Sequence, residues 1–173
     1  MLFTLVLPHW HGDDGWRIQQ WRAGRDPQAD LVAPHITLMF GAHAEEGEYH
    51  SHVAEVALGE VPFDFSFGWA MPYPTASNRV HVMLLAEQGA ASFSRLHRRL
   101  YDGPLAGLRA KDRPFVPHVT IGVMDDFGKA LELCDAWNGN EPPVRGTAGS
   151  LVIGELDGPV LRTLAELPLK GRP

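Results

Sequence analysis

The sequence predicts an α+β protein of bilobal form, in which two related β-α-β-α-β lobes turn their mainly antiparallel sheets toward a central cleft. The first observation is a repeat: Pro-His-Ile-Thr-Leu at 34–38 returns as Pro-His-Val-Thr-Ile at 117–121. The second is that both copies lie in the same order of strand-like and helix-like segments. Because the repeat occurs only twice, it indicates an internal duplication about a pseudo-twofold axis rather than a repeat array.

The elements of the first half follow from the spacing of apolar residues. A short apolar run opens the chain, and Pro8 ends it too early for a signal peptide or a membrane span. It is better interpreted as a buried strand. The expected strands are 2–7, 34–38 and 63–69, and the expected helices are 14–24 and the stretch with Tyr49, Val53 and Val56 at i, i+4 and i+7.

The second half repeats this order, and one further strand follows it. The expected strands are 80–85, 117–121 and 149–154, and the expected helices are 92–102 and the stretch with Phe127, Leu131, Cys134 and Trp137 at helical spacing. The turn Asp157-Gly158-Pro159 precedes a last strand at 160–167.

These segments predict one bilobal domain over residues 1–173, with lobes at 1–70 and 79–155. The linker between the lobes is expected at 71–78, where prolines and small polar residues suit a crossing loop. The last strand, 160–167, is expected to return to the sheet.

Composition limits the classes of partner. The formal net charge is −6. This charge argues against a protein that binds long duplex DNA, because such binding depends on neutralising many phosphates. A nucleotide or an RNA end, held by a few local cations, remains compatible with this charge. Cys134 is the only cysteine, so no intramolecular disulfide can form. We expect a cytoplasmic, monomeric protein with no membrane contact.

The repeated His-x-Thr pattern carries the functional hypothesis. Side chains alternate between the two faces of a strand, so His35 and Thr37 share one face, as His118 and Thr120 do in the second copy. The intervening and following residues, among them Ile36, Leu38 and Phe40, are expected on the opposite, apolar face. Polar side chains in such a row need hydrogen-bond partners, and an anionic ligand in a wet cleft would supply them.

Such a pair of strands suits hydrolysis of a cyclic phosphodiester. The reaction needs a base that deprotonates water and an acid that protonates the departing oxygen, on opposite sides of phosphorus. Histidine serves both roles because its ordinary pKa is about 6.5. Threonine hydroxyls can donate hydrogen bonds to the non-bridging oxygens. The scheme needs no metal and no other cofactor.

A structural role for both histidines is the alternative. One His-x-Thr would mean little, but here both copies follow proline, lie among β-type apolar residues and occupy equivalent places in a repeat. The pattern therefore favours chemistry.

The paired motifs, together with Arg25-Asp26-Pro27 and the run 113–118, resemble those of the two-histidine (2H) phosphoesterase superfamily. That superfamily includes the 2′-5′ RNA ligase-like proteins and the RNA 2′,3′-cyclic phosphodiesterases, and the resemblance covers almost the whole chain. It implies a bilobal α+β fold with the motifs lining a cleft. It also implies that His35, Thr37, His118 and Thr120 are active-site residues, and that the protein hydrolyses or, in reverse, ligates phosphodiesters of RNA ends or small nucleotides.

The sequence departs from many phosphodiesterase members, which place Ala-Arg directly after the second motif. Gly122-Val123 stands there instead, so the phosphate cation stays open among Arg79, Lys111 and Arg113. Each of these is more often a solvated surface charge than a site residue. Trp10, Tyr73 and Phe115 lie in loop-like sequence and are the candidates for stacking on a base.

Two other functions compete with this hypothesis. One is a non-catalytic nucleotide-binding or RNA-end-binding protein of the same fold, against which the intact His and Thr pairs argue. The other is a metal-dependent hydrolase that uses His9 and His11, whose imidazoles could share one face of an extended segment. Cys134 fits the apolar face of its helix and is interpreted as a core residue.

Overall fold

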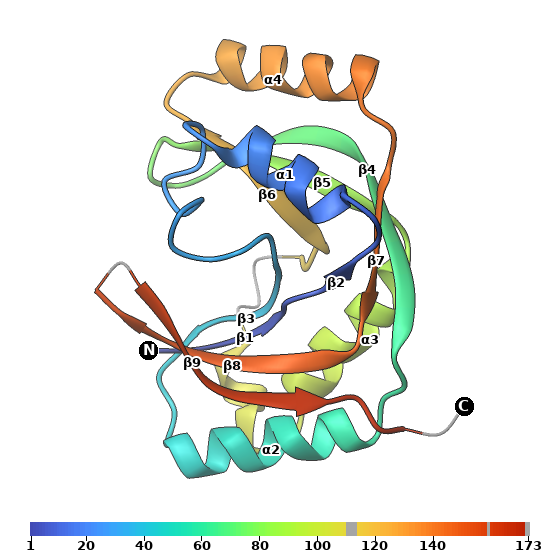
Figure 1. The fold of residues 1–173 in the computed structure, drawn as a ribbon. Coiled ribbons are helices and arrows are strands. Elements are labelled where there is room, and N and C mark those ends of the chain that lie inside the picture. Colours follow the sequence, from blue (N-terminus) through green and yellow to red (C-terminus); the bar gives the residue numbers. More distant parts are fainter. Residues whose placement is uncertain (110–113, 159, 172–173) are drawn as a thin grey trace.

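The computed structural model describes residues 1–109, 114–158 and 160–171, which form two antiparallel sheets with helices on their outer faces (Figure 1). The strands are β1 (Leu2–Val6), β2 (His9–Trp10), β3 (Ile36–Ala42), β4 (Phe63–Pro74), β5 (Val80–Gln88), β6 (His118–Met124), β7 (Val144–Ala148), β8 (Ser150–Asp157) and β9 (Val160–Pro168). The helices are α1 (Asp14–Arg22), α2 (Glu46–Leu58), α3 (Ala90–Leu100), α4 (Phe127–Asn140) and a 3-10 helix, η1 (Gly103–Leu108).

The predicted elements are all present in the predicted order, and the α+β class is confirmed. The short strands β2 and β7 are additional. One sheet has the order β3-β1-β8-β9, and the other has the order β2-β7-β4-β5-β6. The two motif strands, β3 and β6, are therefore edge strands of different sheets, and they contact each other.

The sheets do not divide where the predicted lobes divide. The third strand of the first half, β4, pairs with β5 and β7, and the third strand of the second half, β8, pairs with β1. Each half of the chain thus contributes its last strand to the other sheet. The alternation of residues predicts the face that a strand buries but not the strand beside it, so the predicted lobes 1–70 and 79–155 do not coincide with the two sheets.

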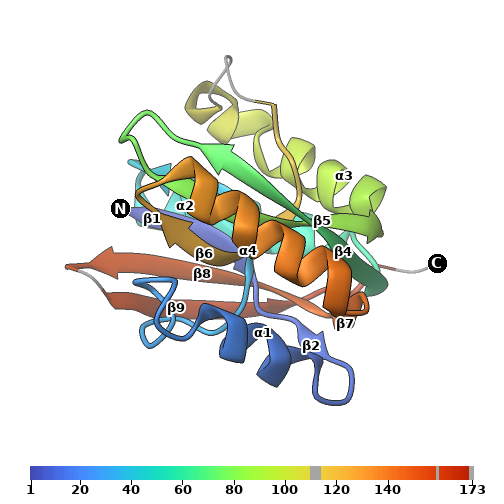
Figure 2. The ribbon, with the colours of Figure 1, turned by 90° about the horizontal axis from the view of Figure 1, so that it is seen from above.

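The helices cross over in the same way. Helix α1 packs against β6 and β7, and α3 packs against β3. Helix α4 covers β4, β5 and β6, whereas α2 lies against β8 and β9 on the opposite side of the molecule (Figures 1 and 2). Each motif strand is therefore backed by a helix from the other half of the sequence. No helix in the described ranges has the length and apolarity needed to cross a bilayer.

The prediction of a crossing linker at 71–78 is wrong. Strand β4 continues to Pro74 and forms a hairpin with β5, in which Tyr73 pairs with His81 and Pro74 with Val80. Prolines are tolerated here because β7 pairs only with residues 63–67 of β4. Beyond that segment β4 pairs with β5 alone, so its other edge has no strand partner. Because Pro72 and Pro74 lie in this part of β4, the N–H groups that they lack take no hydrogen bond from that edge.

Both motif strands carry a β-bulge directly after the threonine. Thr37 pairs with Leu5 but Met39 with Thr4, so one extra residue separates them on β3. In β6, Thr120 pairs with Met83 and Gly122 with Val82, which gives the same offset. A bulge shifts which residues share a face.

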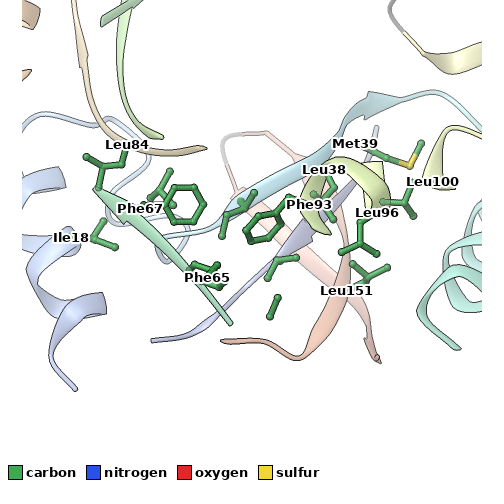
Figure 3. Close-up of a cluster of buried hydrophobic side chains, with 14 of the residues drawn as sticks. Ile18, Leu38, Met39, Phe65, Phe67, Leu84, Phe93, Leu96, Leu100 and Leu151 are labelled. Carbon is green, nitrogen blue, oxygen red and sulfur yellow. The ribbon is translucent and has the colours of Figure 1, made fainter. Parts of the chain in front are cut away.

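The bulge corrects one expectation about faces. Ile36 and Leu38 are fully buried, as the alternation predicts, but Met39 is buried as well and Phe40 is 52% exposed. Phe40 therefore lies on the same side as Thr37, toward the cleft. The apolar side of both sheets forms a continuous core, part of which is seen in Figure 3, where Phe65, Phe67 and Phe93 lie together between the sheets.

A buried hydrogen bond ties α2 to the central strand β1. The hydroxyls of Tyr49 and Thr4 lie 2.7 Å apart, both residues are fully buried, and burial raises the pKa of Tyr49 to about 12. Removing one partner leaves a buried polar group unsatisfied, which costs about 1–3 kcal/mol.

We expect Tyr49→Phe and Thr4→Val each to lower the free energy of unfolding by that amount, and the double variant to lose less than the sum of the two. Urea denaturation of the four proteins measures this coupling. Additive losses would show that the two hydroxyls do not interact.

Candidate active site

A cavity of about 210 Å³ lies where the two motif strands meet. All four residues of the paired motifs line it: His35, Thr37, His118 and Thr120. Each of the four is partly exposed, whereas Ile36 and Val119 between them are buried. The structure therefore brings together the two His-x-Thr pairs that the sequence singled out.

Both imidazoles are held by the same local hydrogen bond. The Nδ1 of His35 lies 2.9 Å from the carbonyl oxygen of Ala33, and the Nδ1 of His118 lies 2.8 Å from that of Val116. A carbonyl oxygen can only accept, so Nδ1–H is the donor in each ring. In both neutral rings the unprotonated nitrogen is then Nε2, which is the atom available for proton transfer.

The surroundings lower the pKa of both imidazoles. Loss of water around each ring is the largest cause, and the hydrogen bond to the backbone carbonyl partly opposes it. The guanidinium of Arg22 lowers the pKa of His35 further, whereas the carboxylate of Asp26 raises it. For His118, the neighbouring imidazoles of His81 and His35 lower the pKa. These surroundings therefore favour the neutral form of both rings.

His81 was missed by the sequence reasoning. It lies on β5, beside the second motif strand, and it lines both this cavity and the one described next. Desolvation lowers its pKa as well. A signal was present, because His81 stands between the buried Val80 and Val82, so the alternation places it on the cleft face of the strand.

A second cavity, of about 320 Å³, adjoins the first and shares Phe40, His81 and His118 with it. Two of the predicted stacking residues, Tyr73 and Phe115, line this second cavity. Tyr73 is 43% exposed, and the ring of Phe115 stacks on that of His97 with centroids 4.0 Å apart. The volume of this second cavity falls within the range of about 300–1,000 Å³ that is usual for small-molecule sites.

The third stacking candidate, Trp10, lines neither cavity. Trp10 belongs to β2, at the opposite edge of the five-stranded sheet from β6, and packs edge-on against Phe65. Nothing in the sequence indicates that this tryptophan packs against aromatic side chains of the core and not beside the cleft.

Of the three cation candidates, the structure describes only Arg79. Arg79 lines neither cavity and pairs with Asp125, its Nε 2.8 Å from the carboxylate. Lys111 and Arg113 lie outside the described residues. Arg22, at the end of α1, does line the smaller cavity although its spacing in the sequence gave no hint of this.

His9 and His11, the alternative metal ligands, line neither cavity. The Nε2 of His11 lies 3.0 Å from the hydroxyl of Thr147. Within residues 1–109, 114–158 and 160–171 no three His, Cys, Asp or Glu side chains gather in a way that could hold a metal. Cys134 is buried in α4, and burial raises its pKa to about 11, which confirms it as a core residue.

Comparison with known proteins identifies the family and agrees with the fold. Residues 9–159 match the family model of the 2′-5′ RNA ligase superfamily. The chain therefore belongs to this superfamily, the two-histidine phosphoesterases. A search of curated proteins finds no significant match.

Solved structures share the fold at low sequence identity. The chain is similar to TT0787 of Thermus thermophilus, with a TM-score of 0.63 and 20% identity over 99% of this chain and 98% of that one. It is also similar to Escherichia coli LigT complexed with 3′-AMP, with a TM-score of 0.61 and 20% identity over 97% of each chain. Kluyveromyces marxianus Usb1 gives a TM-score of 0.57 at 12% identity over 97% of each chain.

The lowered pKa values of the two motif histidines lead to a prediction. In the free protein we expect both rings to titrate below about pH 6.5, because desolvation disfavours the imidazolium. Inorganic phosphate should raise both midpoints, since a bound anion favours the charged ring. Histidine NMR titrations with and without phosphate measure this. The ring signals of His50, which is exposed on α2 and lines neither cavity, are the internal control for phosphate binding and should not shift when phosphate is added at constant pH. Midpoints above the ordinary histidine value in the free protein would contradict the described surroundings.

Proposed function

We propose that the protein is a metal-independent phosphoesterase that opens 2′,3′-cyclic phosphates of RNA ends or small nucleotides, with His35 and His118 as the acid/base pair. The observation that carries the proposal is that two His-x-Thr pairs from different sheets line one cavity, each imidazole having its Nδ1 bound to a backbone carbonyl. Membership in the superfamily supports the same reaction class.

The proposed reaction is an in-line displacement at phosphorus. The Nε2 of one histidine takes a proton from water as the water oxygen bonds to phosphorus. The bond from phosphorus to the ribose oxygen breaks, and the other histidine gives its Nε2 proton to that oxygen. Thr37 and Thr120 donate hydrogen bonds to the non-bridging oxygens, where negative charge builds up. Ligation through a 2′-5′ linkage would be the same displacement with the 5′-hydroxyl of a second ribose in place of water. One histidine takes the proton of that hydroxyl as its oxygen bonds to phosphorus, and the other protonates the 3′-oxygen as its bond to phosphorus breaks.

The second cavity suits the nucleoside part of the substrate. It adjoins the phosphate cavity at His118, and the exposed ring of Tyr73 offers a face to a base. Phe115 and Phe40 add apolar surface from two other segments. A mononucleotide in this arrangement would place its cyclic phosphate between the motif histidines. LigT of E. coli, which has a similar fold, has been crystallised with 3′-AMP, ATP and NADP+.

The first test is a pH–rate profile, in EDTA, of hydrolysis of 2′,3′-cyclic nucleotides. A pair with one neutral and one charged ring gives a bell-shaped profile whose two limbs belong to the coupled pair. His35→Ala and His118→Ala should each lower kcat at least about 100-fold. The double variant should lose far less than the product, since the residues act as a unit.

His50→Ala is the matched control and should keep the activity of the unmodified protein, since His50 is exposed on α2 and lines neither cavity. Near-normal kcat in His35→Ala or His118→Ala would contradict the two-histidine mechanism. Nucleotide binding without turnover would favour the non-catalytic alternative. Turnover that is lost in EDTA and restored by zinc would favour the metal-dependent alternative.

The second test concerns the nucleoside cavity. Tyr73→Ala should raise KM for a nucleoside 2′,3′-cyclic phosphate about 5- to 100-fold, because stacking on a base is worth about 1–3 kcal/mol. It should leave kcat/KM for glycerol 1,2-cyclic phosphate, which lacks a base, unchanged. Steady-state kinetics on both substrates separates the two effects. Equal losses on both substrates would place Tyr73 outside base recognition.

A further inference from the structure

Arg22 provides the charge that the His-x-Thr pairs lack. Threonine hydroxyls and neutral imidazoles carry no positive charge, whereas a phosphodiester and its transition state are anionic. Among the described residues that line the smaller cavity, Arg22 is the only arginine or lysine. Its side chain is almost completely buried, with 1% of the residue exposed, so water screens its charge weakly.

The guanidinium of Arg22 is fixed on two of its three nitrogens. Its Nε donates to the carboxylate of Asp26 at 2.8 Å. Its Nη1 donates to the carbonyl oxygen of Val32 at 2.8 Å and to the side chain of Gln19 at 3.1 Å. From Nη2 there is no hydrogen bond to any residue of the described chain. A buried guanidinium that is rigidly held and retains two N–H donors is suited to bind a ligand oxygen.

Asp26 keeps this arrangement in place. Its second carboxylate oxygen accepts the backbone N–H of Gln28 at 2.9 Å, and the residue is 7% exposed. The Arg22–Asp26 pair is neutral overall, which lowers the cost of burying the guanidinium before substrate arrives. The pair also lies close to the first motif, because both charges act on the imidazole of His35.

We propose that Nη2 of Arg22 binds a non-bridging phosphate oxygen of the substrate and that Asp26 is the positioning residue for this guanidinium. The inference deepens the proposed function, on which it rests, and supplies the phosphate cation that the sequence left open. Arg22 also anchors the segment before His35 through Val32, so its structural and its binding roles use different nitrogens.

The test compares Arg22→Lys with Arg17→Lys. Arg17 lies on the same helix and forms ion pairs with Asp14 and Glu141, but it lines neither cavity. Both variants keep the charge and lose guanidinium hydrogen bonds. Calorimetry with inorganic phosphate in EDTA gives Kd, and steady-state kinetics on one cyclic nucleotide gives kcat/KM. We expect Arg22→Lys to weaken phosphate binding and lower kcat/KM roughly 10- to 100-fold, the range for one charge-assisted hydrogen bond.

Arg17→Lys should change neither quantity. A folded Arg22→Lys that binds phosphate and turns over substrate as well as the unmodified protein overturns the inference but leaves the activity. Phosphate binding that depends on Arg22, without turnover of any cyclic phosphate, supports the inference and overturns the proposed function. Absence of phosphate binding in the unmodified protein overturns the inference.

A second measurement needs no variant. In the unmodified protein, phosphate should slow the exchange of the Arg22 guanidinium protons with water, because the anion would cover Nη2. Nitrogen-15 NMR of the arginine side chains reports this. Arg17 should be unaffected. Unchanged exchange at Arg22 under saturating phosphate overturns the inference even if Arg22→Lys fails to fold.

Discussion

The two motif strands belong to different sheets, so the cavity between them exists only while the two sheets are held in one position relative to each other. The exchange of third strands holds them there: β4, from the first half of the chain, pairs with β5, and β8, from the second half, pairs with β1. Neither sheet can form from one half of the chain alone. The helices add to this constraint, since α1 and α3 each pack on a strand from the other half. The site is therefore assembled by long-range pairing.

The β-bulges of the two motif strands determine which side chains line the cavity. Each motif strand has one extra residue after its threonine. Pairing is regular beyond it in β6, whereas β3 has a second register shift between Met39 and Ala42. The bulge on β3 turns Phe40 from the apolar side toward the cleft, where it lines both cavities. Without it, Phe40 would follow Ile36 into the core, and the boundary between the two cavities would lose its aromatic side chain. A local irregularity thus adds an aromatic side chain to the surface that the motif presents.

The sequence was informative where the physics is local. Period-two alternation separated His35 and Thr37 from Ile36, and it could have separated His81 from Val80 in the same way. It failed where the outcome depends on partners far along the chain: which sheet receives β4, and whether Trp10 lies beside Phe65 or beside the cleft. Arg22 is the clearest case, since a helical arginine normally indicates a solvated face, and only tertiary packing buries it next to the first motif.

The matching Nδ1 hydrogen bonds of His35 and His118 have one more consequence. Two rings oriented by the same i−2 carbonyl both present Nε2 to the cavity side, so this hydrogen bond does not by itself distinguish one ring from the other. The neighbouring side chains distinguish the two rings: Arg22 and Asp26 lie near His35, and a third imidazole, that of His81, lies near His118. In a reversible phosphoryl transfer, the ring that acts as base in one direction acts as acid in the other. For the reaction proposed at this site, the direction of net turnover then depends on the concentrations of substrate and product relative to the equilibrium constant, and not on which ring begins as the base.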